Sequence, residues 1–403
     1  MENITQKKSW LFKISLLSVS LLSMGAAAVS ATIPLMAKTL SDVSLASIEM
    51  ITSIPNFGII IFVFLSPFIA KLIGDKKTTL LGLTVTLFAG IYPMFSENYT
   101  AILISRFLLG CGIGLFNSFA YSLIGYYFEG EERAKMMGYQ AATSSIGSTV
   151  ISLLVGVLIK YGWHASYGVY AIAIISIVLF GIFVPETKHE IKSQSGTHKV
   201  SAEKTKISPM VALYTVYLFF IYIGFMTVIY KLATLMISMG YGTATEASTI
   251  SGGITIVGFI AGIVFGKVHK KLNVFTLPIS VALTGIGIYI IGASTSMIIT
   301  IIGGLILGFF SGCVTPYFFY RATLYSNDAS QTLSSSLMII GINLGCFLNP
   351  YIIAFVNNLF GTTSIAFSVK FAGIFVLALG VINLLAIKKE THQVGENNEI
   401  GGF

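Results

Sequence analysis

Charged residues are scarce in this sequence. They occupy 10% of its 403 positions, whereas ordinary soluble domains carry roughly 25%. Hydrophobic residues occupy 55%, so too few polar side chains remain to cover a surface that faces water. This composition excludes a soluble globular protein.

Cysteine and histidine are scarce as well. Cys111, Cys313 and Cys346 all fall within apolar stretches, which excludes a disulfide framework and favours packing roles. The five histidines are predicted in loops or tails, without a partner at metal-ligand or general-base spacing. A Gly-rich phosphate loop is also missing, which argues against ATP-driven transport by this chain alone. We therefore expect no enzyme activity, no metal and no cofactor.

Long apolar runs fill most of the chain. A helix needs about 20 apolar residues to cross a bilayer core of roughly 30 Å, and unbroken runs such as Ala171–Val184 exclude the alternating pattern of a barrel. The sequence therefore predicts an all-α membrane protein. Twelve spans are expected, near Leu11–Leu35, Ile48–Ile69, Leu80–Phe95, Ala101–Tyr126, Gly138–Ile159, Tyr167–Val184, Pro209–Met236, Ala247–Phe265, Val274–Ala293, Met297–Phe319, Ser334–Phe355 and Ser364–Ile387.

The spans fall into two sets of six. The set in residues 1–185 is separated from the set in 209–403 by a lysine-rich polar segment, 186–208, which has the composition of a linker. Short motifs recur between the two halves at near-constant spacing, which predicts two related bundles that move against each other. The matches are Ala70–Leu72 with Gly266–Val268 at an offset of 196, and Arg106–Gly110 with Gly304–Gly308 and Ser145–Gly147 with Asn343–Gly345, both at 198.

The basic residues predict the orientation in the membrane. Most of the 24 lysines and arginines lie in the tails, the linker and the loops of one side, and such loops normally face the cytoplasm. We therefore expect a monomeric multi-pass protein of the plasma membrane with both termini cytoplasmic. The net charge of +8 then reflects topology and does not imply a nucleic-acid partner.

The first span also imitates a signal peptide. Lys7, Lys8 and Lys13 precede an apolar run that ends in the small residues Ala28–Ala31. Cleavage there would leave an odd number of spans and remove the match between the first and second halves. We therefore expect this segment to be retained as the first span.

Three motifs resemble the major facilitator superfamily, and the resemblance covers the whole chain. Ile104–Gly114 is similar to the family's intramembrane arginine followed by spaced glycines, Tyr127–Gly138 to its acidic-then-arginine turn, and Pro185–Thr187 to the close of its sixth span. The resemblance implies a carrier of bacterial type with two six-helix bundles, which moves a small molecule by alternating access. The sequence departs from the family at Ala70–Lys77, which lacks the usual Asp-Arg pair, and at Ser148, where drug/proton antiporters carry proline.

Charges predicted inside the membrane are the main functional candidates, because burying a charge there costs at least about 2.5 kcal/mol. Arg106 lies well inside the fourth span, and Lys231 lies toward the outer end of the seventh. Arg106 either lines the cavity or braces backbone carbonyls or Glu49; Lys231 either lines the cavity or extends to the interface. The candidate substrate-binding residues are Arg106, Asn117, Tyr121, Tyr217, Thr227, Lys231, Ser311, Thr315 and Asn343.

Carboxylates suggest the nature of the substrate. In this family spans one, four, seven and ten line the cavity, and here they contain no Asp or Glu. A positive cavity favours an organic anion; the alternative is a multidrug/proton antiporter that exports lipophilic compounds. Glu49 and Glu246, within one residue of equivalence at the offset of 196, are candidates for coupling to a proton or another ion, unless both simply face water. Candidates for a cytoplasmic latch are Lys71, Asp75, Lys76, Lys77 and Arg133.

Overall fold

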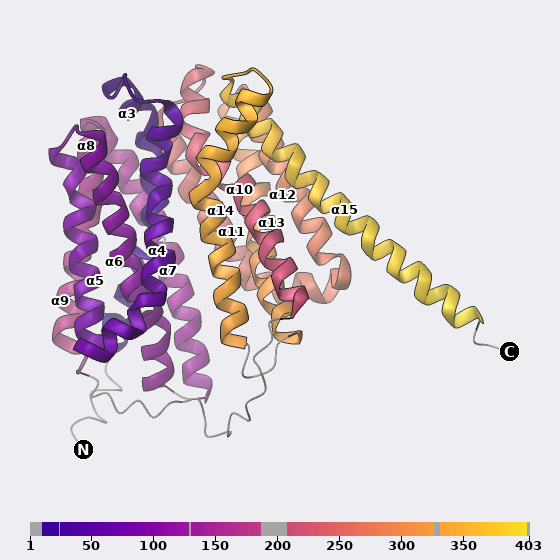
Figure 1. Ribbon diagram of the computed structural model, residues 1–403, viewed down its shortest axis with the longest axis horizontal. Coiled ribbons are helices and arrows are strands. Elements are labelled where there is room, and N and C mark those ends of the chain that lie inside the picture. The colour runs from indigo at the N-terminus through magenta and orange to yellow at the C-terminus, as the bar shows by residue number, and fades with distance from the viewer. Residues whose placement is uncertain (1–9, 24, 129, 187–207, 326–330, 401–403) are drawn as a thin grey trace.

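The computed structural model describes residues 10–23, 25–128, 130–186, 208–325 and 331–400, and these residues form helices and short turns without a strand (Figure 1). The first half contains α2 (Trp10–Ser18), η1 (Val19–Leu22), η2 (Gly25–Thr32), α3 (Ile33–Thr39), α4 (Leu45–Ile73), α5 (Asp75–Ile91), η3 (Tyr92–Phe95), α6 (Tyr99–Tyr127), α7 (Gly130–Leu158), η4 (Ile159–Tyr161), α8 (Trp163–Ser166), η5 (Tyr167–Ala171) and α9 (Ile172–Phe183). The second half contains α10 (Pro209–Ser238), α11 (Ala244–Leu272), η6 (Asn273–Phe275), α12 (Thr276–Ala293), α13 (Met297–Leu324), α14 (Gln331–Leu359) and α15 (Ile365–Ile400).

The helices are long enough to give the twelve predicted spans. Ten helical stretches in the described residues have the length and hydropathy of a membrane span, and a pair bent by 44°, Trp10–Leu22 with Gly25–Thr39, forms an eleventh. One of the ten, Ala244–Ala293, is 50 residues long. At 1.5 Å per residue it would measure about 75 Å, more than twice the bilayer core. It consists of α11 and α12, which supply one span each.

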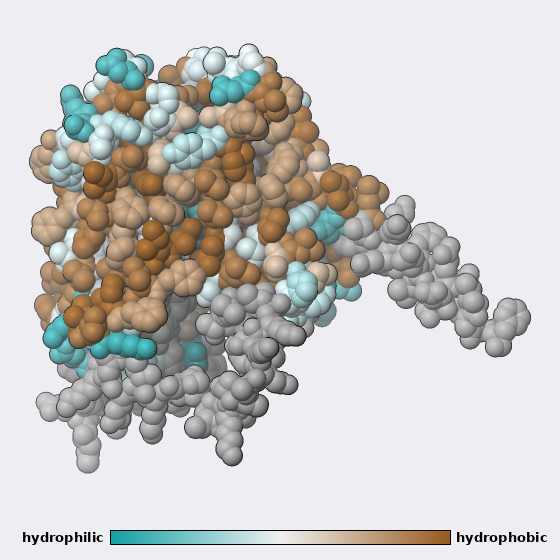
Figure 2. Space-filling model, viewed as in Figure 1, coloured by the Kyte–Doolittle hydropathy of each residue, from teal (hydrophilic) through white to brown (hydrophobic). Residues whose placement is uncertain are grey.

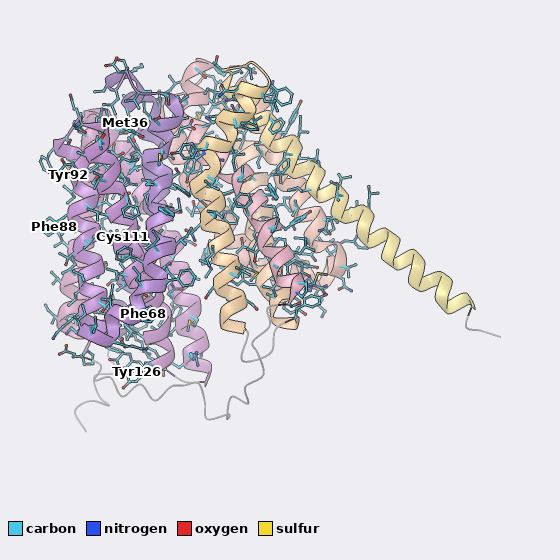
Figure 3. The ribbon with its side chains drawn as sticks, viewed as in Figure 1. Met36, Phe68, Phe88, Tyr92, Cys111 and Tyr126 are labelled. Carbon is cyan, nitrogen blue, oxygen red and sulfur yellow. The ribbon has the colours of Figure 1, made fainter. Side chains whose placement is uncertain are left out.

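The surface between the two ends of the bundle is apolar. Figure 2 shows a broad hydrophobic band with hydrophilic residues gathered toward the top and bottom. Phe88 projects from this band, as Figure 3 shows, and is 70% exposed. Exposed large hydrophobic side chains are unfavourable in water, and this band has the place expected of a lipid-facing surface.

Polar caps begin four helices at the end of the bundle opposite Glu186 and Ser208, which we call the outer end. Ser44 accepts a hydrogen bond from the backbone of α4, Asn98 from α6, Thr243 from α11 and Ser296 from α13. Such caps satisfy backbone N–H groups that a helix leaves unpaired. They also fix the repeat: corresponding caps are 199 residues apart for α4 and α11, and 198 apart for α6 and α13. The offset of 196 predicted for the second and eighth spans is therefore wrong.

Glycines let the helices of each half approach closely, and the two halves repeat the same approaches. A Cβ atom added to Gly110 would lie 2.0 Å from the Pro55 carbonyl oxygen, and one added to Gly308 would lie 2.6 Å from that of Ile254. Small residues at such crossings are typical of membrane helices, because packing and not the hydrophobic effect holds these helices together.

Gly110→Ala is therefore expected to destabilise the protein. The added methyl group has to push the backbone of α4 away from α6, and overpacking of this kind costs about 1–3 kcal/mol. The midpoint of thermal unfolding in detergent measures the loss. Gly253→Ala is the matched control, since its Cβ would meet no atom within 4 Å; equal midpoints for the two variants would contradict the assigned packing.

Candidate functional site

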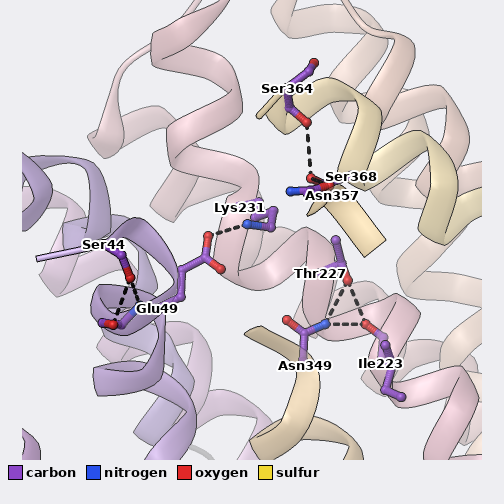
Figure 4. A network of polar contacts seen from close by, with 10 residues as sticks. Ser44, Glu49, Ile223, Thr227, Lys231, Asn349, Asn357, Ser364 and Ser368 are labelled. Atoms are coloured by element: carbon purple, nitrogen blue, oxygen red, sulfur yellow. Dashed lines mark hydrogen bonds and ion pairs between the residues drawn. The ribbon is translucent and has the colours of Figure 1, made fainter. Parts of the chain in front are cut away.

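A buried ion pair joins the two halves. Lys231 Nζ in α10 donates to Glu49 Oε1 in α4 at 2.5 Å, and only 4% and 1% of the two side chains are exposed (Figure 4). Glu49 lies in the second turn of α4, after the Ser44 cap, and Lys231 lies two turns before α10 ends. The pair therefore sits toward the outer end, where it links helices 182 residues apart in the sequence.

This pair changes the charge expected for the cavity. Lys231 does not extend to the membrane–water interface. Its positive charge is compensated by Glu49, a carboxylate from the second span. Glu49 does not face water. Glu246, by contrast, accepts hydrogen bonds from the backbone and side chain of Thr243 and forms the capping box of α11. The predicted equivalence of the two glutamates is wrong, because at the offset of 199 Glu49 corresponds to Ser248.

Two further sets of contacts close the outer half of the interface between the bundles. Where α4 meets α10 and α14, Asn56 lies 3.5 Å from the Tyr230 hydroxyl, and the rings of Phe57 and Phe347 stack with their centres 4.9 Å apart. Where α7 meets α11, hydroxyls bond to carbonyls of the opposite helix. These bonds run from Thr245 to Gly156 at 2.8 Å, from Ser248 to Ser152 at 2.5 Å and from Thr149 to Gly252 at 3.4 Å.

The hydrogen bonds of Arg106 stay within the first half. Its side chain is fully buried and donates to the carbonyl oxygens of Ala26 at 2.7 Å and Ile51 at 3.2 Å, and to the Tyr170 hydroxyl at 2.9 Å. Its guanidinium also faces the rings of Tyr167 and Tyr170. The Tyr170 hydroxyl donates in turn to the Gly25 carbonyl. Arg106 thus ties the first, second, fourth and sixth spans together through three of its donors.

The neutral candidates mostly bond within the protein. Thr227, Ser311 and Asn343 each donate to a carbonyl of their own helix, that of Ile223, Gly308 and Ile339 respectively. Tyr217 donates to the Leu379 carbonyl in α15. Asn117 is half-buried in α6, and the side chain of Tyr121 lies outside the described residues.

Tyr222, Tyr230 and Asn56 were missed as candidate sites. Thr315 pairs with Tyr222 at 3.0 Å, and Asn349 donates both amide hydrogens to α10, to the Ile223 carbonyl at 2.7 Å and to Thr227 Oγ1 at 2.8 Å. Asn56 and Tyr230 form the contact described above. Asparagines within apolar spans are the one signal that points to Asn56 and Asn349 in advance, because an unpaired amide is costly there.

The predicted latch residues lie at the opposite end from the ion pair. Lys77 lies 3.4 Å from Glu186, Lys71 faces the Phe68 ring, and Asp75 begins α5 after Gly74, whose φ is +92°. Lys76 is half-buried and Arg133 exposed. Glu186 and Phe68, which Lys77 and Lys71 contact, belong to the first half, so a latch between the two halves stays a prediction.

Comparisons with known proteins agree on the fold. The model of the Major Facilitator Superfamily matches residues 15–278. A TsgA homolog of Buchnera aphidicola is 21% identical over 76% of this chain and 78% of its own length, and Sugar transport protein 14 of Arabidopsis thaliana is 25% identical over 40% of this chain but only 32% of that protein. A solved D-xylose-proton symporter covers 93% of this chain and 97% of its own with a TM-score of 0.74 at 14% identity, and the peptide transporter PepTSo covers 95% and 98% with a TM-score of 0.72 at 14% identity.

Proposed function

The chain belongs to the major facilitator superfamily and is a membrane transporter, not an enzyme; we propose that it carries a small polar solute across the plasma membrane by alternating access. Both termini face the cytoplasm in this proposal, which the distribution of lysine and arginine supports. Transport is secondary active or facilitative. The observation that carries the proposal is the buried Glu49–Lys231 pair, which links the two halves near the outer end.

Glu49 and Lys231 form the outer gate in this proposal. Opening toward the outside separates α4 from α10, so the pair has to part. The hydroxyl contacts between α7 and α11 separate more easily, because a serine or threonine hydroxyl can return to a carbonyl of its own helix; Thr149 already lies 3.0 Å from the Ser145 carbonyl. Separating two buried charges is costlier by far. The resistance to opening is therefore concentrated in one ion pair.

Protonation of Glu49 is the proposed coupling step. A neutral carboxyl holds an ammonium group much less strongly than a carboxylate does, so a proton reaching Glu49 weakens the gate. Glu49 Oε2 is buried without a hydrogen-bond partner, and this oxygen is available for the proton. Glu246 has no such role here, since it caps α11.

The solute is proposed to be neutral and polar. The predicted organic anion required uncompensated positive charge, but Arg106 is engaged by protein acceptors and Lys231 is neutralised by Glu49. A lipophilic cation, the substrate expected of a drug exporter, would find no free carboxylate there, because the charge of Glu49 is compensated by Lys231. Amide and hydroxyl groups remain, from residues such as Asn117, Tyr222 and Thr315. The names of two similar proteins, a sugar transport protein and a D-xylose-proton symporter, fit this class.

Flux into proteoliposomes with an applied proton gradient tests the proposal. Panels of neutral polyols and sugars, organic anions and lipophilic cations of similar size are compared, and we expect saturable uptake from the neutral panel. Uptake of anions or cations alone would overturn the solute class.

A disulfide provides the matched control for alternating access. A Cβ on Gly252 would lie 3.6 Å from the Ser152 Cβ, which suits a disulfide, so Ser152→Cys with Gly252→Cys locks α7 to α11. Oxidation is expected to reduce flux at least tenfold and reduction to restore it, while each single variant stays active. Undiminished flux through the oxidised protein would contradict alternating access. The native cysteines are buried, which confines the reaction to the new pair.

A further inference from the structure

Some buried hydrogen-bond acceptors near the outer gate have no donor. Asn349 is fully buried, and its Oδ1 has no hydrogen-bond donor. Glu49 Oε2 is likewise buried without a hydrogen-bond donor. Lys231 has three N–H donors, of which one is directed at Glu49 Oε1. Glu49 Oε2 on α4 and Asn349 Oδ1 on α14 are therefore buried acceptors without a donor, and the Lys231 ammonium on α10 has donors to spare.

The orientation of the Asn349 amide is fixed by its neighbours. Thr227 Oγ1 donates its hydrogen to the Ile223 carbonyl, so it can only accept from Asn349. The second amide hydrogen goes to that same carbonyl of Ile223. A rotated amide would place its oxygen against a carbonyl oxygen, which is unfavourable. The Nδ2 atom must therefore face α10, and the oxygen is directed away from these contacts, as Figure 4 shows.

Lys231 projects from the turn that Asn349 contacts. Lys231 and Thr227 are four residues apart on α10 and so share one face of the helix. Side chains of a helix lean toward its N-terminus, so the lysine side chain extends back over the turn that carries Thr227. Figure 4 shows Thr227 between Lys231 and Asn349.

We propose that Asn349 is a positioning residue that supplies the second acceptor for the Lys231 ammonium, through Oδ1, when Glu49 becomes protonated. The inference rests on the proposed function of the Glu49–Lys231 pair as the outer gate. Once Glu49 is neutral, the ammonium is still buried until the halves separate, and the amide oxygen of Asn349, which contacts α10 one turn before Lys231, then keeps it paired. The gate can then lose its ionic bond while still closed.

The other ionisable groups nearby are engaged elsewhere. Arg106 donates to the Ile51 carbonyl, two residues after Glu49. The Tyr230 hydroxyl donates to the Cys346 carbonyl and receives the Asn56 amide. Tyr351 faces Met50 from α14. Thr234 Oγ1 on α10 is also buried without a partner, but it lies C-terminal to Lys231, whereas helical side chains lean toward the N-terminus. Asn349 is therefore the acceptor that we assign to Lys231 beside Glu49.

The distance between spin labels on the two halves tests this role. Labels at Asp42→Cys and Thr363→Cys, both exposed near the outer end, report gate opening by double electron–electron resonance in nanodiscs at a series of pH values. The unaltered gate is expected to open as the pH falls. Asn349→Leu should shift the midpoint of opening about one unit toward acid, a roughly tenfold higher proton concentration, because protonating Glu49 then leaves Lys231 unpaired.

Asn349→Asp should shift the midpoint in the opposite direction, because a second carboxylate pairs with Lys231 and makes protonation of Glu49 easier. It has nearly the same volume, so it remains informative if Asn349→Leu does not fold; it loses the two hydrogen bonds to α10, which lowers stability without changing the direction of the shift. Asn357→Leu, an amide of the same helix bonded to Ser368, is the control and should leave the midpoint unchanged. An unchanged midpoint in both Asn349 variants, or shifts of the same sign, would overturn the proposal. If Glu49→Gln also leaves the gate unaffected, the proposed gate itself fails.

Discussion

Lys231→Met is expected to lower the free energy of unfolding by about 3–5 kcal/mol, because it leaves the Glu49 carboxylate buried without its partner. Glu49→Gln leaves the Lys231 ammonium buried without a negatively charged partner and should cost a similar amount. Reversible unfolding in mixed micelles measures both losses. These are large effects for a single substitution, since most cost about 1 kcal/mol.

The double variant Glu49→Gln with Lys231→Met separates the energy of the pair from its function. With both charges removed, most of the stability is expected to return, because nothing charged is left buried. Transport should then lose its dependence on the proton gradient, since the group proposed to bind the proton is gone. Lys370→Met, at a half-buried lysine of α15, is the control and should stay within about 0.5 kcal/mol of the unaltered protein. A double variant as unstable as either single one would show that the two side chains do not act as a unit.

Arg106→Leu is expected to have a comparable effect by a different route. It removes the donors for Ala26, Ile51 and Tyr170 at once, and hydrogen bonds to charged groups contribute roughly 1.5–3 kcal/mol each. We expect the free energy of unfolding to fall by about 3–5 kcal/mol and the yield of folded protein to fall with it. Thermal unfolding in detergent provides the measurement.

Arg106→Lys distinguishes a brace from a binding residue. A lysine keeps the charge but cannot reach three acceptors in different directions, because its ammonium is a compact group and not a planar fork. We therefore expect it to lose most of the same stability. Tyr170→Phe, which removes one of the acceptors, should cost about 1 kcal/mol. If Arg106→Lys kept its stability and instead weakened solute binding, Arg106 would belong to the substrate site, as the organic-anion hypothesis required.

The fold was accessible from the sequence because hydropathy acts locally. Each apolar run identifies its own span, and the match between Ser145–Gly147 and Asn343–Gly345, which predicted related halves, falls at a packing site that both halves contain. Added Cβ atoms on Gly147 and Gly345 would lie 2.3 Å from the Leu21 carbonyl oxygen and 2.6 Å from that of Phe219. A glycine that is needed where two helices approach closely can be recognised in the sequence, whichever helix it packs against.

The sequence contains no comparable signal for which charged residues pair with each other. Arg106 and Lys231 were equivalent candidates as long as each was judged on its own span, yet one bonds within the first half and the other joins the two halves. The error in the repeat had the same origin. The caps of α4 and α11 require an offset of 199, but the sequence comparison used 196. Because each residue turns a helix by about 100°, this difference matched Glu49 with a residue on another face of α11.

The sequence by itself determined that this is a helical membrane protein of two six-span halves. Only helices and closed barrels satisfy their backbone hydrogen bonds in a bilayer, and the unbroken apolar runs exclude a barrel. Only the tertiary structure decided which buried charges are paired. Ion pairing depends on distances of a few ångströms between helices far apart in the chain, and those distances are set by the packing of the two halves. That packing turns Glu49, one carboxylate among 16 acidic residues, into the partner of Lys231.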